Sequence, residues 1–243
     1  MTANAIKLFL KNKSKSISFD EKDHIYLLNG VELKSVTRVI GTYSQPFDIN
    51  GNILKSCARR DGLTVDEMKA KWEDVKNEAC TRGTSFHDYL EKRVRAVSEK
   101  LPDICLRYTK SSELFLKWLK SKNWVLVDTE VIVYDENKGI AGQIDLLVYD
   151  LVRKKLIILD YKTNKKIVRD NKYKKFMITP FHDYADNNYN HYSLQLNIYA
   201  GILRDWGLDV AEEKVLLHFS DNKFAVILCD NTIYDKFTTI EKF

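Results

Sequence analysis

The feature that most constrains the fold of this chain is a short apolar run that ends in charged residues. Residues 156–159 are all apolar and are followed directly by Asp160, Tyr161 and Lys162. Such a run is typical of a strand that is buried on both faces. Because successive side chains of a strand point to opposite faces, Asp160 and Lys162 are expected on one face and Tyr161 on the other. The sequence therefore predicts an acid and an ammonium side by side in the protein interior, where charges need a partner or a metal ion.

A second predicted strand, over residues 140–149, is separated from this run by the polar turn 150–154. The two strands are expected to form a hairpin that brings Asp145 beside Asp160. Two carboxylates next to Lys162 would suit a hard cation such as Mg²⁺, which prefers oxygen ligands. The alternative is a solvated hairpin with an Asp-Lys pair on the surface, but so apolar a run is unlike an exposed strand.

Length and composition indicate one folded domain. The 243 residues are enough for one sizeable core, and 44% hydrophobic with 30% charged residues is ordinary for a folded protein. The formal net charge of +5 is modest, but between Arg153 and Lys175 there are ten Lys or Arg and only two acidic residues. A local positive field next to a pair of carboxylates indicates a polyanionic substrate.

The cysteines and the first residues bear on the cellular compartment. The cysteines are scattered without Cys-x-x-Cys spacing, which is typical of reduced packing residues: Cys57, Cys80, Cys105 and Cys229. No apolar run approaches the roughly 18 residues of a membrane span, and residues 1–16 lack the apolar segment of a signal peptide. These features predict an intracellular, cytoplasmic protein without membrane association.

Residues 1–45 are predicted to form an extension that contains a β-hairpin. Short strands are expected at residues 17–19, 25–28 and 31–33. Asn29-Gly30 is a strong signal for the turn between the last two, and Ser35 is expected to cap a helix through Ile40. His24 is interpreted as a surface residue of this hairpin.

Helices are expected between residues 64 and 121, whereas residues 47–62 show no periodicity and are interpreted as a connection. Thr64 begins a capping box, and Arg82-Gly83-Thr84 is expected to separate the first helix from the next. That next helix carries His87 and Glu91 one turn apart on a shared face.

A helix, a strand and a long loop are expected after the helix that carries His87. The helix spans residues 112–121, and the strand at 124–134 carries Glu130 among apolar residues. Glu130 is either a functional acid or a residue tolerated at an edge position. Residues 164–188 are polar, basic and aperiodic, and their lysines alternate with aromatic residues, as in segments that bind phosphates and stacked bases. A plain solvated loop is the alternative.

The last part of the chain is predicted to contain a helix at 189–206 that projects Gln195 and Tyr199 from one face. A buried amide needs a partner, so Gln195 is expected to contact the site or a ligand, unless the helix face is solvated. A hairpin and a short amphipathic helix follow, within residues 210–243. This order of elements predicts an α/β fold with a mixed sheet flanked by helices.

Four segments together resemble the PD-(D/E)XK nuclease superfamily, and more narrowly its RecB-like exonuclease branch of bacteria, phages and mitochondria. The segments are Arg82 to His87, Gly142-Gln143-Ile144-Asp145, Asp160-Tyr161-Lys162-Thr163 and Gln195-x-x-x-Tyr199. Each is weak alone, but four in the right order and spacing, over roughly residues 80–205, are specific. The resemblance implies a restriction-endonuclease-like core in a single domain, residues 1–243.

The resemblance also implies roles for individual residues. His87, Asp145 and Asp160 would ligate Mg²⁺ or Mn²⁺ together with the backbone carbonyl of Tyr161. Lys162 would be the catalytic lysine, and Glu130 would supply an acid from the preceding strand. The substrate-binding residues would be Gln195, Tyr199, Thr163, Lys165, Lys166 and Arg169. Some members hold an iron-sulfur cluster with one cysteine before the motifs and three after them, but here three precede and one follows, so no cluster is expected.

The implied function is metal-dependent hydrolysis of DNA by an exonuclease that acts on linear or single-stranded ends and leaves 5′-phosphates. A structure-selective endonuclease and a catalytically inactive nucleic-acid-binding module on the same fold remain alternatives. An acid-base pair of Asp145 and Asp160 acting on another substrate would leave Lys162 and the basic loop unexplained. A helicase or recombination partner is also expected, and high Lys and Asn with few Gly and Pro indicate an AT-rich genome, such as that of a virus or phage.

Overall fold

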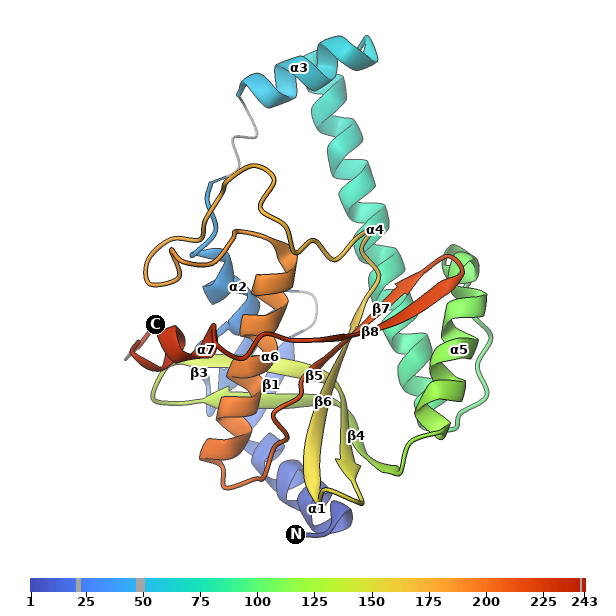
Figure 1. The fold of residues 1–243 in the computed structure, drawn as a ribbon, viewed down its shortest axis with the longest axis vertical. Coiled ribbons are helices and arrows are strands. Elements are labelled where there is room, and N and C mark those ends of the chain that lie inside the picture. The colour runs from blue at the N-terminus through green and yellow to red at the C-terminus, as the bar shows by residue number, and fades with distance from the viewer. Residues whose placement is uncertain (21–22, 47–50, 241) are drawn as a thin grey trace.

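The computed structural model describes residues 1–20, 23–46, 51–240 and 242–243, and a mixed sheet with helices on both faces forms its centre (Figure 1). The strands follow the order β1-β2-β3-β5-β6-β7-β8, with β4 paired to β5. Their bounds are β1 Ile17–Asp20, β2 Ile25–Leu28, β3 Val31–Ser35, β4 Trp124–Asp135, β5 Ile140–Asp150, β6 Lys155–Lys162, β7 Val215–Ser220 and β8 Lys223–Leu228. The β3–β5 and β6–β7 pairs are parallel and the others antiparallel. The predicted fold class, with its N-terminal hairpin, is confirmed.

The N-terminal hairpin joins the sheet directly beside the strand that carries Asp145. Asn29 and Gly30 have φ of 50° and 84°, as the predicted turn requires. After this turn, β3 pairs in parallel with β5 at Lys34 and Ser35. The Ser35 side chain then accepts a hydrogen bond from the Arg38 backbone N–H and begins α2, Val36–Gly41.

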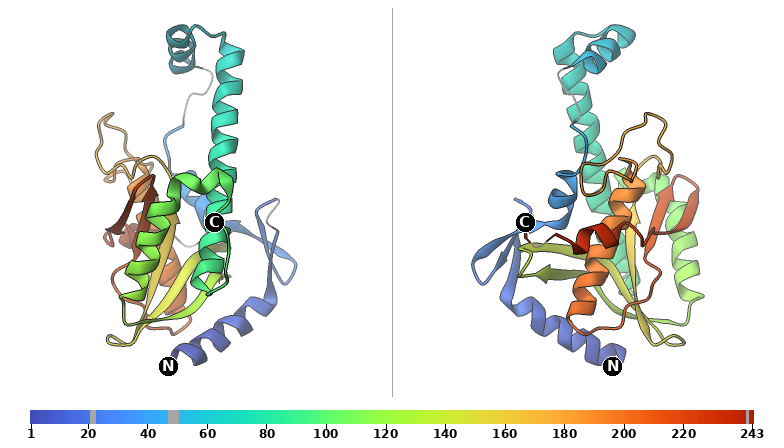
Figure 2. Two further views of the ribbon diagram at one scale, coloured as in Figure 1. Left: turned by 90° about the vertical axis from the view of Figure 1, so that its right-hand side faces the viewer. Right: turned by 60° about the vertical axis from the view of Figure 1, so that its left-hand side comes forward.

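Helix α3, Asn52–Asp61, and the first part of α4, Val65–Val94, form an arm that projects from the body of the protein (Figures 1 and 2). The last turns of α4 pack on the body. The prediction of an aperiodic connection was wrong for residues 52–61, because Leu54 and Ala58 lie one turn apart and pack on Met68. Gly62, with φ of 68°, ends α3 as a left-handed cap.

Helix α4 continues through the segment where the sequence predicted a break. The expected capping box at Thr64 is present, but Arg82-Gly83-Thr84 remains helical. A single glycine inside a helix costs only about 1 kcal/mol relative to alanine, which tertiary packing of the following turns readily offsets. The apolar residues Phe86 and Leu90, both fully buried, provide that packing.

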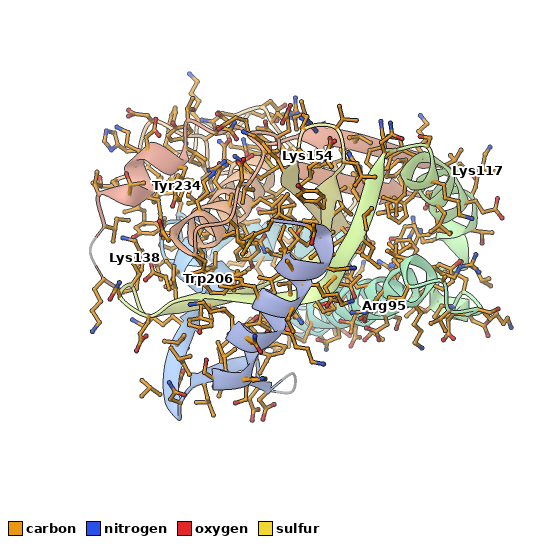
Figure 3. The ribbon with its side chains drawn as sticks, turned by 90° about the horizontal axis from the view of Figure 1, so that it is seen from below. Arg95, Lys117, Lys138, Lys154, Trp206 and Tyr234 are labelled. Atoms are coloured by element: carbon orange, nitrogen blue, oxygen red, sulfur yellow. The ribbon has the colours of Figure 1, made fainter. Side chains whose placement is uncertain are left out.

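The helices cover the two faces of the sheet with separate apolar clusters (Figure 2). On one face, α4 and α5, Thr109–Lys120, place Phe86 and Phe115 against Tyr161 and Phe219. On the other, α6, Asn188–Asp205, packs its apolar side against β5 and β6. At the end of α6, Trp206 contacts Phe9 of α1, Ala3–Lys13, with ring centroids 6.4 Å apart (Figure 3).

The remaining segments follow the predicted order. Residues 163–187 contain no helix and only the isolated bridge between Phe176 and Ala185, consistent with the predicted long loop. The C-terminal helix α7 is shorter than the predicted amphipathic pattern and spans Tyr234–Thr238. Among the described residues, no helix is long and apolar enough to cross a membrane.

Candidate active site

The β5–β6 hairpin changes its bonding pattern at the point where the predicted site begins. The backbone ladder runs from Asp150 and Lys155 at the turn to Leu146 and Leu159. At the site, the Tyr161 N–H instead donates to a carboxylate oxygen of Asp145, with an N–O distance of 2.6 Å. A charged acceptor shortens and strengthens such a bond. Asp145 Oδ2 therefore takes the place of a backbone acceptor, and the same oxygen lies 3.6 Å from His87 Nδ1.

The two faces of β6 separate as the side-chain period requires. Tyr161 lies in the aromatic cluster with Phe115 and Phe219, whereas Asp160 and Lys162 line a cavity of about 540 Å³ on the other side. The Lys162 ammonium lies 2.5 Å from Asp160 Oδ2 and 4.4 Å from the ring centroid of Tyr192 on α6. This confirms the predicted pairing of the acid and the ammonium below the surface.

A second set of residues meets at the floor of this cavity. Ligand atoms of His87, Glu130 and Asp145 all lie within 4.8 Å of one another, and the His87 Nδ1 to Asp145 Oδ2 distance is 3.6 Å. Glu130 lies level with Asp145, because the flanking pairs of the β4–β5 register are Thr129 with Leu146 and Val131 with Ile144, and it adopts a left-handed φ of 51°. A positive φ at a residue other than glycine is uncommon and marks a special local geometry.

The residues that lie closest together differ from those predicted from the sequence. Glu130, expected only as a nearby acid, takes the place expected for Asp160. Asp160 lines the same cavity but contacts Lys162 instead. That contact is a close ion pair, because the Lys162 ammonium lies 2.5 Å from Asp160 Oδ2.

The donors present fit a hard divalent cation. Mg²⁺ holds its ligands at about 2.1 Å, so two ligands of one ion lie within about 4.2 Å, a spacing that small rotations of His87, Glu130 and Asp145 would reach. Carboxylate oxygens with one imidazole are also a suitable set for Mn²⁺.

The carboxyl groups of Glu130, Asp145 and Asp160 differ in pKa because of burial and of the charges around them. Burial raises the pKa of Glu130 to about 8, and the neighbouring Asp145 adds to the shift. Burial also raises the pKa of Asp160 to about 6, although Lys162 opposes it. For Asp145, burial is outweighed by His87, Lys162 and the Tyr161 N–H, so its pKa is lowered. Asp145 is therefore the most strongly ionised acid of the group.

The carboxylates in turn raise the pKa values of the two basic groups, His87 and Lys162. Burial alone would lower the pKa of His87, but Asp145 outweighs it and the pKa is raised. The pKa of Lys162 is raised as well, because Asp160 and Asp145 together outweigh its desolvation. Positive charge is therefore favoured in this cavity, and Lys162 is held as an ammonium.

Helix α6 supplies the predicted amide and phenol. Gln195 Nε2 donates to Tyr199 Oη at 3.0 Å, and both side chains line the cavity. The Tyr199 ring lies directly over Gly142, where an added Cβ would be 2.6 Å from the phenol oxygen. The glycine of the Gly142-Gln143-Ile144-Asp145 segment is therefore explained by close approach of a ring and not by backbone conformation.

The other predicted substrate-binding residues lie outside the cavity. The Thr163 carbonyl accepts a hydrogen bond from Tyr108 Oη at 3.2 Å at the end of β6. Lys165, Lys166 and Arg169 are exposed on the loop that follows. The Arg169 guanidinium lies 4.3 Å from the ring centroid of Tyr189, which keeps this part of the loop close to the start of α6.

The sequence did not indicate that the N-terminal hairpin takes part in the site. Phe19, His24 and Tyr26 line the same cavity as His87 and Asp160. His24 is exposed, as expected, but it lies at the cavity and has φ of 54°. Tyr26 is 2% exposed, and burial together with the nearby carboxylates raises its pKa. Only the parallel pairing of β3 with β5 brings these residues here, and local sequence patterns do not reveal such long-range pairing.

Comparisons with known proteins give little similarity. No family model and no curated protein matches the chain. One structural neighbour is the protein SSO0001, with 21% identity and a TM-score of 0.28 over 52% of this chain and 53% of that one, so the chain spans about half the length of that protein. Another is a "putative exonuclease" from Eubacterium rectale, with 15% identity and a TM-score of 0.38 over 72% of this chain and 68% of that one. Similarity at this level does not define a function.

Proposed function

We propose that this protein is a metal-dependent DNA nuclease of the PD-(D/E)XK type, of the RecB-like branch, that hydrolyses phosphodiester bonds. The observation that carries the proposal is the meeting of His87, Glu130 and Asp145 in one cavity with the ion pair of Asp160 and Lys162. Three acidic side chains, one imidazole and one ammonium at this spacing match the needs of phosphoryl chemistry, in which both charge neutralisation and a positioned water are required.

His87, Glu130 and Asp145 would hold Mg²⁺ or Mn²⁺, with Asp160 and the Tyr161 carbonyl as further ligands. When bound, the ion would neutralise charge on a non-bridging phosphate oxygen and lower the pKa of a coordinated water. Binding requires Glu130 to lose the proton that burial favours, because only the carboxylate is an effective ligand. We expect metal binding to release protons near neutral pH.

Lys162 has the role that its position allows. Its ammonium is held by Asp160 on one side and by the Tyr192 ring on the other, so its direction is restricted. From this position it would orient the attacking water and stabilise the negative charge that develops on the phosphate in the transition state. In-line attack by that water would leave a 5′-phosphate end.

The substrate would be DNA with a free end or a single-stranded region. The exposed basic residues of the 163–187 loop, Lys165, Lys166 and Arg169, would contact phosphates outside the cavity. Inside the cavity, the α6 residues Gln195 and Tyr199 would contact the DNA strand or orient Lys162. A helicase or recombination enzyme that produces such ends would be a suitable functional partner.

The test uses end-labelled linear DNA and covalently closed circular DNA, each single- and double-stranded, in Mg²⁺, Mn²⁺ or chelator. We expect the linear substrates to be degraded only with metal. Asp160→Asn and Lys162→Ala should abolish cleavage while leaving the circular dichroism spectrum and DNA binding largely intact. The exposed ion pair of Lys100 and Asp103 provides matched controls, and Lys100→Ala and Asp103→Asn should cleave normally.

The outcomes separate the proposal from its alternatives. Cleavage of closed circles would favour a structure-selective endonuclease on the same fold. Binding of DNA without turnover in any metal would identify an inactive binding module. Wild-type rates for Asp160→Asn or Lys162→Ala in Mg²⁺, or full activity in chelator, would contradict the site assignment.

A further inference from the structure

The N-terminal hairpin presents a small aromatic stack at the wall of the cavity. Phe19 of β1 stacks on Tyr26 of β2, with ring centroids 4.5 Å apart and an interplanar angle of 22°. His24 meets the Phe19 ring edge-on at 5.2 Å and 85°, and the Tyr26 ring at 5.8 Å and 77°. The stack has a buried end at Tyr26 and an open end, because Phe19 is half-buried and His24 is exposed.

This aromatic stack lies on the cavity that holds the candidate metal ligands. Phe19, His24 and Tyr26 all line it together with His87 and Asp145. The stack is held there by the sheet, because β2 pairs with β3, and β3 pairs in parallel with the start of β5, at residues 140 and 141. A group bound against Phe19 would therefore lie next to the reacting phosphate and not at a remote surface.

The charges around the cavity indicate which part of a nucleic acid this wall would bind. Helix α4 contributes Asp88 and Glu91 to the lining of the cavity, in addition to Glu130 on β4. The carboxylates of Asp88 and Glu91 are unfavourable neighbours for a second phosphate, and Lys162 is the one Lys or Arg among the described lining residues. The hairpin wall is uncharged and aromatic apart from His24, so it suits the neutral, flat part of a nucleotide. Bases stack on Phe, Tyr and His side chains in single-stranded nucleic acid complexes.

We propose that the open end of the Phe19 and His24 pair binds a nucleobase of the substrate strand by stacking, beside the phosphate to be cleaved. This inference rests on the proposed nuclease function and adds a subsite for an unpaired base. Such a subsite requires that at least one nucleotide be unstacked from a duplex, so it favours single-stranded or frayed ends over intact duplex. It is independent of base identity, because every base has a π face.

The test measures binding of fluorescein-labelled single-stranded DNA to the full chain by anisotropy in Ca²⁺, with one abasic position moved along the oligonucleotide. We expect one or two abasic positions to raise the Kd of the wild type by about tenfold. Phe19→Leu should raise the Kd for intact DNA by a similar factor. For DNA that is abasic at one of those positions, the variant and the wild type should have the same Kd. Phe19→Tyr, which keeps a ring, should bind like the wild type.

Controls separate stacking from a purely structural role of the hairpin. Leu27 lies between Tyr26 and Leu28 on the opposite side of β2 and is 37% exposed, so Leu27→Ala should leave every Kd unchanged. Thermal unfolding of each variant shows whether the hairpin remains folded. If the losses of binding free energy caused by Phe19→Leu and by the abasic position are additive, or if neither change weakens binding, the proposed base subsite is wrong.

The outcome is also distinguishable from failure of the nuclease proposal. Cleavage in Mg²⁺ without coupling between Phe19 and any base position would leave the nuclease assignment intact and remove the subsite. Coupling in binding without cleavage in any metal would retain the subsite on a protein that binds nucleic acid but does not cut it.

Discussion

The turn end and the site end of the β5–β6 hairpin are built differently, although one continuous pair of strands forms both. Along residues 146–149 and 156–159, toward the turn, backbone groups pair in a regular ladder and the side chains are apolar on both faces. At the site end, Asp145 replaces the ladder acceptor of Tyr161, and buried charges take the place of apolar side chains. Buried like charges destabilise a fold, whereas apolar ladders stabilise it.

The fold places its reactive groups next to a rigid, regular part of the sheet. Proteins depart from locally consistent sequence rules mainly at functional sites and are stabilised elsewhere. Here the regular ladder lies only a few residues from the charges, so the rigid part of the hairpin positions Asp145 and Asp160 directly. Substitutions at the two ends should therefore separate activity from stability.

We expect the strongest effect at Asp145, because its carboxylate both accepts the Tyr161 N–H and belongs to the candidate metal ligands. Asp145→Asn can still accept the Tyr161 N–H but removes a charged ligand, so we expect cleavage in Mg²⁺ to fall by about a hundredfold or more. Asp145→Ala should lose the same activity and also leave the buried N–H unsatisfied, at a cost of about 1–3 kcal/mol in unfolding free energy. Cleavage assays and urea unfolding measure the two effects. Equal stability of the two variants would contradict the structural role of the carboxylate.

At the ladder end, Ile157→Ala should give the opposite result. Ile157 is 1% exposed within the apolar cluster beneath α4 and α5. Removing its buried methyl and methylene groups should lower the unfolding free energy by about 2–5 kcal/mol. Cleavage per folded molecule, measured well below the melting temperature, should stay within about threefold of the wild type because the residue does not line the cavity. A loss of activity as large as that of Asp145→Asn would show that the two ends are not separable.

The pH dependence of stability should come from the site end. Because burial raises the folded-state pKa of Glu130 to about 8, the folded protein keeps a proton that the unfolded chain releases near its ordinary value of 4.5. The stability from this proton is complete below about pH 4.5 and is lost as the pH rises through 8. We expect the unfolding free energy without metal to fall by about 2–4 kcal/mol between pH 5 and pH 8.5.

Glu130→Gln should remove the larger part of that slope and leave the part due to Asp160 and His87, whose pKa values are also raised, whereas Glu136→Gln, on the exposed turn after β4, should keep all of it. Urea unfolding at several pH values in chelator measures the effect. Addition of Mg²⁺ or Mn²⁺ should stabilise the wild type most at the higher pH, where the carboxylate is free to bind. A slope that persists in full in Glu130→Gln would assign the titration to another group.

The sequence predicts the two ends of the hairpin unequally well for a physical reason. The strand period of two and the apolar run of residues 156–159 are local, so the hairpin and the shared face of Asp160 and Lys162 follow from the sequence. The placement of Glu130 level with Asp145 depends on register and on a positive φ, and neither has a local signal. The approach of Phe19 depends on parallel pairing between segments about a hundred residues apart in the chain.

Helices α3 and α4 also show what local sequence signals can and cannot predict. Gly83 is a local signal for the end of a helix, but packing of Phe86 and Leu90 overrides it in α4. For α3, the basic last turn and the Gly62 cap were available signals, and a four-residue spacing of Leu54 and Ala58 completes them. That helix was predictable from the sequence, whereas the continuity of α4 was not.

The smallest expected effect tests whether close packing beside the site end also positions α6. Gly142→Ala would place a Cβ 2.8 Å from Tyr199 Cζ, so the ring must move and its hydrogen bond with Gln195 must weaken. We expect a loss of about 1–3 kcal/mol in stability and a several-fold lower kcat/KM. Gly41→Ala is the matched control, because nothing lies within 4 Å of the added Cβ, and its stability should be unchanged or slightly higher. If Gly142→Ala lowers stability but not kcat/KM, then Gln195 and Tyr199 pack against the sheet without assisting catalysis.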